Sequence, residues 1–204
     1  MLKRVVLALA VLVVGLATVV VSRPSTYRVE RSTPIAAPAE IPFGLVNDLH
    51  RWQYWSPWEE QEPAPRRSYD GAYAGPEALY AWSGGTRGKV AHLEAELYTR
   101  ILLQVDLLAP RARTGTFTFT FQPIPGGTSL NLVMEGQRGF MAKAASLFTD
   151  EEAQVGAELD KALASLKGLS ETEVKNRAER DVLIKARDKA AAQPPTPPPA
   201  PPAP

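Results

Sequence analysis

The stretch at positions 114–122 reads Thr114-Gly115-Thr116-Phe117-Thr118-Phe119-Thr120-Phe121-Gln122, and its alternation decides the fold. Successive side chains of an extended strand point to opposite faces, so the phenylalanines share one face and the threonines share the other. Leu130, Leu132 and Met134 repeat this spacing in the next segment. The two segments therefore predict neighbouring strands of a sheet that has one strongly apolar face.

The period-two signal extends over residues 66–135. Glycine and proline interrupt it where a strand has to reverse, because glycine permits positive φ and proline lacks a backbone donor. The interruptions are Gly75-Pro76, Ser83-Gly84-Gly85, Ala109-Pro110 and Pro125-Gly126-Gly127. The strands predicted between them lie near 66–73, 77–83, 88–96, 99–108, 114–122 and 128–135. This spacing indicates an antiparallel meander, and the alternation from Tyr27 to Ile35 predicts a further strand ahead of it.

Helical spacing flanks the strands on both sides. Apolar residues recur at helical steps between Ile41 and Trp52, which predicts a short helix pair. Beyond Gly139 the spacing indicates a long amphipathic helix, in which Thr149-x-x-Glu152 reads as a capping box. Its apolar positions are Phe148, Val155, Leu159, Leu163 and Leu166. This helix must lie on the apolar sheet face, so the fold class is α+β: a curved antiparallel sheet around a long C-terminal helix, with a cavity between them.

The N-terminus carries a hydrophobic segment. Val5 to Val21 contains no charged side chain, which is about the shortest stretch that can cross a bilayer. A cleaved signal peptide is the alternative, but its apolar region is normally shorter and a small-x-small cleavage site follows it. Lys3 and Arg4 favour a cytoplasmic N-terminus. We expect residues 1–23 to be a single transmembrane anchor, with the body on the extracytoplasmic, periplasmic side of the cell membrane.

Composition bounds the rest of the chain. Its 204 residues suit one domain, which we place at 24–169. A net charge of +1 provides no overall electrostatic attraction for nucleic acid. The absence of cysteine excludes thiol chemistry and thiolate metal sites. Residues 170–193 are charged and alanine-rich, which is typical of a solvated helical extension or a disordered segment. Residues 194–204 form a proline-rich tail, expected to be disordered or polyproline II and a possible docking segment for a protein partner.

The order of elements and several local sequences resemble a known superfamily. The segments that carry the likeness are Ala37-Pro38-Ala39-Glu40, Val46-Asn47-Asp48-Leu49-His50-Arg51-Trp52, Trp55-Ser56-Pro57-Trp58, Tyr69-Asp70-Gly71, Ala78-Leu79-Tyr80-Ala81-Trp82-Ser83-Gly84, and the helix from Phe140-Met141-Ala142-Lys143 to Leu166-Lys167. Over roughly residues 24–168 the chain resembles the START-related SRPBCC superfamily of polyketide cyclases/dehydrases and lipid-transport proteins, in particular bacterial members with an N-terminal hydrophobic segment. The resemblance implies a helix-grip fold that binds a lipid, a polyketide-like compound or another hydrophobic small molecule between sheet and helix. It implies no fixed catalytic motif.

Large apolar side chains are the candidates for lining such a cavity. Trp52 and Trp55 lie in a segment that carries three of the four tryptophans and that helix-grip folds place beside the opening. Simple core packing explains the same residues, and both interpretations stay open. The full set of candidate ligand-binding residues is Trp52, Trp55, Tyr80, Trp82, Phe117, Phe119, Met134 and Phe148.

Polar candidates for catalysis are few. Asp48 and His50 could act as an acid/base pair, but two positions along a helix diverge by about 200°, so joint action requires the helix to break between them. His92, Glu94 and Glu96 are predicted on one strand face, where an exposed polar face explains them better than a metal or proton-transfer site. Arg100, Arg111 and Arg113 are expected to be solvent-facing charges at strand ends.

Three functions follow from these observations. The first is a membrane-anchored carrier or sensor of a hydrophobic ligand, with no cofactor and no metal. The second is a polyketide cyclase or dehydratase that uses Asp48, His50 or Glu94. The third is an envelope scaffold whose proline-rich tail docks a partner.

Overall fold

The computed structural model describes residues 2–58, 65–109, 112–147 and 149–192. Its helices are α1 (Leu2–Ser22), α2 (Glu40–Asn47), the 3-10 helix η1 (Leu49–Tyr54), α3 (Phe140–Ala145) and α4 (Glu151–Ala191). Its strands are β1 (Thr26–Ile35), β2 (Arg66–Asp70), β3 (Leu79–Ser83), β4 (Arg87–Glu96), β5 (Arg100–Ala109), β6 (Arg113–Ile124) and β7 (Gly127–Gln137). The proline-rich tail lies outside the described residues.

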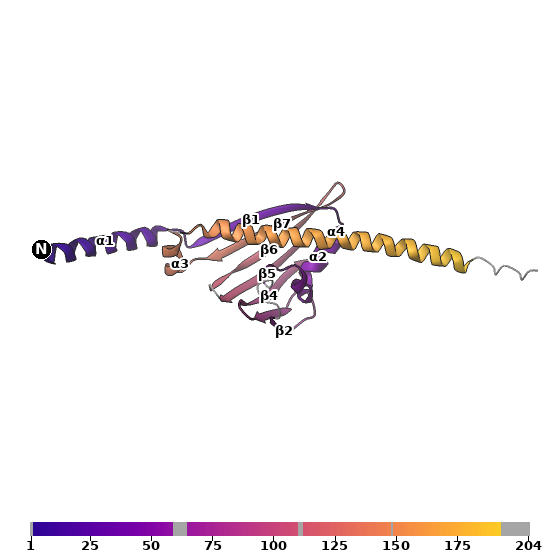
Figure 1. Ribbon diagram of the computed structural model, residues 1–204, viewed down its shortest axis with the longest axis horizontal. Helices are drawn as coiled ribbons and strands as arrows, with labels where there is room; N and C mark the ends of the chain where they lie inside the picture. Colours follow the sequence, from indigo (N-terminus) through magenta and orange to yellow (C-terminus); the bar gives the residue numbers. More distant parts are fainter. Residues whose placement is uncertain (1, 59–64, 110–111, 148, 193–204) are drawn as a thin grey trace, which may run out of the picture.

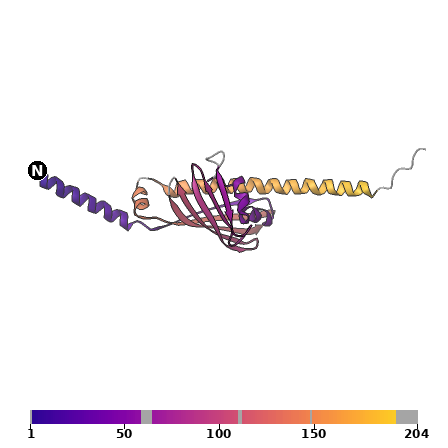
Figure 2. The same ribbon diagram turned by 90° about the horizontal axis from the view of Figure 1, so that it is seen from below.

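One antiparallel sheet contains all of these strands, in the order β1-β7-β6-β5-β4-β3-β2. The meander from β2 to β7 is the predicted one, and β1 joins it beside β7. α4 packs along β1 and lies across one face of the sheet (Figures 1 and 2). The predicted α+β class, a curved antiparallel sheet with a long C-terminal helix, is confirmed.

Alternation along the strands separates the two sheet faces as predicted. Phe117, Phe119 and Phe121 are at most 2 % exposed, and they face the same side as Leu130 and Leu132 of β7. α4 buries Val155, Leu159, Leu163 and Leu166 against this inner face, and α2 adds Ile41, Leu45 and Val46. The core therefore fills the space between the sheet and the helices.

A β-bulge in β4 overturns the prediction that His92, Glu94 and Glu96 share a face. His92 pairs with Leu103 and Glu94 with Leu102, so Leu93 is an extra residue without a partner on β5. A bulge of this kind inverts the in/out parity of the residues that follow it. His92 is consequently buried on the inner face, whereas Glu94 and Glu96 are exposed on the outer face.

The helix predicted beyond Gly139 is in two pieces, and the predicted capping box is wrong. Asp150 is the residue that caps α4, because its Oδ1 accepts a hydrogen bond from the Ala153 backbone N–H at 2.9 Å. Thr149 instead donates its hydroxyl proton to the Ala145 carbonyl. Glu152 forms an ion pair with Arg138 at 3.1 Å. A new helix therefore starts at Asp150, and α3 is left as a separate short helix.

At its other end α4 continues through the charged segment as far as Ala191. Of the alternatives for residues 170–193, a helical extension describes the segment up to that point. The chain from Asp181 onward is exposed wherever the structure describes it, and it projects beyond the sheet (Figure 1).

α1 is long and apolar enough to cross a membrane. Its span Lys3–Ser22 has a mean hydropathy of 2.9, and 6 % of it is buried in the protein. α1 contacts α3, so these two helices lie together at one end of the sheet, where β1 starts and β7 ends (Figure 1).

Candidate ligand-binding site

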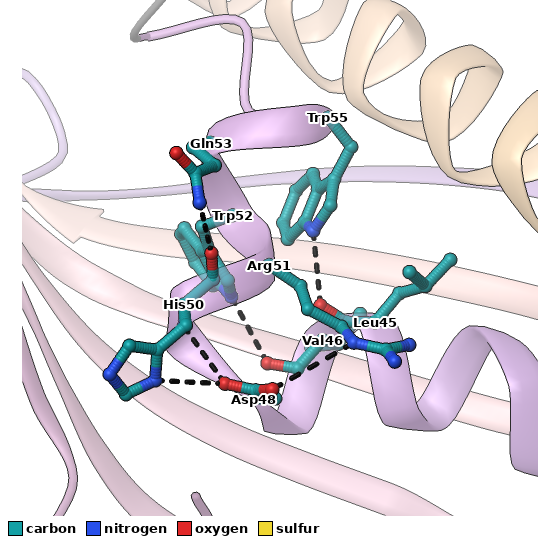
Figure 3. Close-up of polar contacts among 8 residues, drawn as sticks. All are labelled: Leu45, Val46, Asp48, His50, Arg51, Trp52, Gln53 and Trp55. Atoms are coloured by element: carbon teal, nitrogen blue, oxygen red, sulfur yellow. Dashed lines mark hydrogen bonds and ion pairs between the residues drawn. The ribbon is translucent and has the colours of Figure 1, made fainter. Parts of the chain in front are cut away.

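Trp52 and Trp55 lie between α2 and the sheet, and their indole N–H groups are already occupied. Trp52 Nε1 donates to the Val46 carbonyl at 3.0 Å, and Trp55 Nε1 donates to the Leu45 carbonyl at 3.1 Å. Figure 3 shows both bonds tying η1 back onto α2. Both rings are at most 2 % exposed, so these two hydrogen bonds satisfy buried indole N–H groups within the core.

The other aromatic candidates belong to the same core. Trp55 meets Phe119 edge-on, and Phe119 meets Phe117. The members of the predicted set within the described residues are all buried, namely Trp52, Trp55, Tyr80, Trp82, Phe117, Phe119 and Met134. Phe148 lies outside the described residues. Their contact with a ligand stays a prediction.

A polar cluster interrupts this apolar interior near the first turns of α4. Glu158 accepts a hydrogen bond from Trp58 Nε1 at 2.9 Å through one carboxylate oxygen. Its other oxygen lies 3.6 Å from Nη2 of Arg113, the first residue of β6. Trp58 also stacks on Phe117, with ring centroids 5.0 Å apart. The cluster therefore adjoins the aromatic core directly.

Arg113 faces the inner side of the sheet, not solvent as predicted. Its side chain is 18 % exposed, and within the described chain its Nε and Nη1 are buried without a hydrogen-bond partner. A signal for this was present in the sequence, since positions 113, 115, 117, 119 and 121 alternate together and Arg113 shares the parity of the phenylalanines. Arg100 behaves as predicted at a strand end and pairs with Glu94 at 2.9 Å, whereas Arg111 lies outside the described residues.

A hollow of about 370 Å³, here named the mouth hollow, opens beside Arg113. The end of β7, the short helix α3 and the first turn of α4 form its other walls. Its apolar lining includes Met141, Ala142 and Ala145, and its polar lining includes Thr149 and Gln154. The mouth hollow is thus at the end of the sheet where α1 contacts α3.

α3 covers the mouth hollow but is weakly held. None of its residues is buried, and Phe140 and Met141 are 55 % and 78 % exposed. A segment with few buried apolar contacts opens at low free-energy cost. α3 is therefore the part of the wall that can move most readily.

Comparisons with known proteins support the fold but do not assign a function. No family model matches the chain, and no curated protein matches it. Among solved structures, an uncharacterised protein from Rhizobium leguminosarum matches with a TM-score of 0.55 and 15% identity, over 72% of this chain and 95% of that one. The Aha1 dimer structure from Colwellia psychrerythraea matches with a TM-score of 0.52 and 11% identity, over 71% and 96%. StfQ, a di-domain ARO/CYC from the steffimycin biosynthetic pathway, matches with a TM-score of 0.56 and 11% identity, over 74% of this chain and 52% of that one.

The fold is a helix grip. The neighbours include polyketide cyclase-like and Aha1-like proteins of this type, in line with the superfamily resemblance. Proteins that share a fold at such low identity carry unrelated activities, so the function of this helix grip has to be argued from its own residues.

Asp48 and His50 do meet, because the helix breaks between α2 and η1 as their joint action requires. Asp48 has an extended backbone and caps η1, accepting from the His50 backbone N–H at 3.0 Å. The same Oδ1 lies 3.0 Å from His50 Nδ1 (Figure 3). The His50 ring stacks between Tyr69 and Tyr73, at centroid distances of 4.1 and 4.5 Å. Neither Asp48 nor His50 lines the mouth hollow.

The remaining polar candidates are dispersed over the helix grip. His92 is buried with Nε2 3.1 Å from Asn47 Oδ1, and burial lowers its pKa to about 4. Glu94 is on the outer face in its ion pair with Arg100. Within the described ranges no three His, Asp or Glu side chains gather in a way that could hold a metal ion.

A second hollow, of about 730 Å³, lies on the outer sheet face. Its lining includes Arg28, Gln104 and Glu135, and Arg28 forms ion pairs with both Glu30 and Glu135. These charges are satisfied by each other. Among the described residues, the lining of the mouth hollow contains one charged residue, Arg113, and that of the second hollow contains two, Arg28 and Glu135, so a hydrophobic ligand would cover fewer charged groups in the mouth hollow.

Proposed function

We propose that this protein is a membrane-anchored helix grip that binds a hydrophobic small molecule, a lipid or polyketide-like compound, and acts as its carrier or sensor. The observation that carries the proposal is the mouth hollow. It lies under a weakly held helix, at the end of the domain where the membrane-length helix α1 emerges.

The walls of the mouth hollow suit an apolar ligand. Met141, Ala142 and Ala145 offer apolar surface, and small-molecule sites of this size are mostly apolar with a few polar groups. Each square ångström of apolar ligand surface removed from water contributes about 25 cal/mol, so a lipid-sized molecule reaches micromolar affinity without any covalent step.

The position of α3 supplies a route for such a ligand. Exposed Phe140 and Met141 stand on the helix that contacts α1, so they would lie near the membrane surface if α1 spans the bilayer. A lipid leaving the bilayer would then meet α3 first. Displacement of α3 would open the mouth hollow, whose Arg113 is linked through Glu158 to Trp58, stacked on Phe117. The buried aromatic candidates, including Trp55 and Phe119, would be reached only by a ligand that penetrates further into the core.

Binding explains the site better than catalysis does. A cyclase or dehydratase needs proton-transferring groups that converge on the substrate. Of the three candidates for that role, Asp48 and His50 touch each other away from the mouth hollow and Glu94 lies on the outer face. Binding of a hydrophobic molecule does not require any of these three side chains.

Native mass spectrometry tests the proposal on the full chain. The protein is extracted from the membranes of its own host in a mild detergent, and the bound lipids are then extracted and identified. We expect one hydrophobic molecule per chain that survives removal of bulk lipid. A chain that carries none, and that also fails to bind a panel of fluorescent fatty acids and polyketides, would contradict the proposal and favour a scaffold role.

A further inference from the structure

The buried donors of Arg113 define what the ligand of the mouth hollow must offer. A guanidinium has five N–H donors in a planar fork. Within the described chain, the Nε and Nη1 of Arg113 are buried without an acceptor. Buried unpaired donors destabilise a protein, and more so when they are charged. Such a group is retained at low cost only if an acceptor binds there for part of the time.

Glu158 does not supply the missing hydrogen-bond acceptor for Arg113. Its nearer oxygen is 3.6 Å from Arg113 Nη2, which is beyond hydrogen-bonding distance. Its other oxygen is used by Trp58 Nε1. Glu158 thus balances the charge of Arg113 without accepting a hydrogen bond from its Nε or Nη1. Hydrogen bonds from a charged guanidinium to a carboxylate or phosphate are about twice as strong as those between neutral groups, so an anion is the acceptor that would satisfy these donors best.

We propose that Arg113 binds the anionic head group of an amphiphile, a carboxylate or a phosphate, whose apolar tail lies along α3. This inference rests on the proposed function and narrows the ligand class. The head group would lie in the mouth hollow beside Arg113, and Met141, Ala142 and Ala145 would cover the first part of the tail. A volume of about 370 Å³ is at the low end for small-molecule sites, which fits a head group with a short length of chain better than a fused-ring compound.

Photolabelling in nanodiscs tests this directly with the full chain. Two probes have the same diazirine-bearing oleyl tail, and they end in a carboxylic acid or in an alcohol. At alkaline pH the acid is ionised and the alcohol is neutral. Labelling of α1 measures how much of each probe is in the bilayer, and saturable labelling of peptides from α3, the start of α4 and β6 measures occupancy of the mouth hollow. We expect the acid to label the hollow at least about tenfold more efficiently than the alcohol, relative to α1.

Paired variants separate the charge from the packing. Arg113→Met keeps the length of the side chain and removes its donors, so the preference for the acid should disappear while labelling by the alcohol persists. Glu158→Gln removes the competing negative charge and keeps an oxygen for Trp58 Nε1, so labelling by the acid should increase about threefold. Arg87→Met, at the exposed start of β4, removes an equal charge at the same end of the sheet and should change nothing.

Each outcome decides between the two claims. Equal labelling by acid and alcohol, or a preference that survives in Arg113→Met, would overturn the role of Arg113 and leave the proposed function intact. An absence of saturable labelling by either probe would overturn both. Competition by unlabelled oleate or by oleoyl lysophosphatidate identifies the head group, since the stronger competitor shows whether a carboxylate or a phosphate fits.

Discussion

His92 shows how one residue can make the whole domain sensitive to pH. Its side chain is 3 % exposed, its Nε2 faces Asn47, and within the described chain its Nδ1 has no partner. Burial disfavours the imidazolium, which is why the pKa is lowered to about 4 from the ordinary 6.5. The unfolded chain therefore takes up a proton at His92 between these two values and the folded chain does not.

The free energy of unfolding should consequently fall as the pH drops through this window. Stability from a neutral His92 is fully present above about pH 6.5 and is lost progressively toward pH 4. We expect the wild type to lose about 1 to 3 kcal/mol relative to His92→Gln between about pH 7.5 and about pH 4.5. Urea unfolding of the two full chains in a mild detergent measures this. A difference between them that does not change with pH would show that folding does not lower the pKa of His92.

Arg113 marks the limit of residue-scale prediction. Its alternation with Phe117 places it on the inner face, but its charge and strand-end position favour solvent, and the two rules conflict. Burial became possible because α3 and α4 cover this end of the sheet, and no local pattern around Arg113 encodes that covering. The contact between Asp48 and His50 was easier to predict, because it depends on a helix cap between residues two positions apart.

At the scale of elements, predictions from the alternation of side chains were correct for regular strands and failed where the hydrogen-bond ladder is irregular. The faces of β5, β6 and β7 were predictable because one apolar face requires one register. The bulge at Leu93 was not predictable, because no glycine or proline marks it and the extra residue is visible only in the pairing with β5. The division of α3 from α4 depended on whether Thr149 or Asp150 caps the helix, and both residues are good caps.

Two glycine substitutions test how the elements are built. Gly88 in β4 lies opposite Trp82, and a Cβ there would stand 2.5 Å from the indole ring, so Gly88→Ala should destabilise the protein by about 1 to 3 kcal/mol. Gly168 in α4 has open space around it and an ordinary helical backbone, so Gly168→Ala should stabilise by about 0.5 to 1 kcal/mol. Chemical denaturation gives both values. The same sign for the two variants would contradict the packing described for one of them.

At the scale of the whole molecule, the length of α4 that the domain needs can be read from its contacts. Ser170 is fully buried, Glu171 accepts a hydrogen bond from the Ala36 backbone N–H, and Arg177 pairs with Glu40 on α2. From Asp181 onward the described side chains are exposed. The folded body therefore extends past the boundary predicted at residue 169.

Truncation should reveal this limit. Deleting residues 181–204 should leave the midpoint of thermal unfolding within about 2 °C of the full chain, because the described part of that segment buries nothing. Deleting residues 170–204 should lower it by several degrees, because it removes Ser170 and both contacts of α4 with Ala36 and α2. Equal midpoints for the two truncated chains would place the boundary at 169 after all.

The absence of cysteine makes membrane orientation directly measurable. Leu183 is 69 % exposed on the projecting part of α4, so Leu183→Cys adds a single accessible thiol. If the body is extracytoplasmic, a membrane-impermeant maleimide should label it in cells whose outer membrane alone is permeabilised. Labelling that requires lysis of the inner membrane would place the body in the cytoplasm.

The projecting end of α4 affects the direction in which the chain leaves the domain more than the distance that it spans. Its residues 181–191 are about 16 Å long as a helix, and a flexible chain of the same length would span about as much. A coil would spread that span over every angle, whereas the helix holds it along one line. The helix therefore fixes the direction in which the chain leaves the domain, and that direction is set near the other end of α4, where Gln154 lines the mouth hollow.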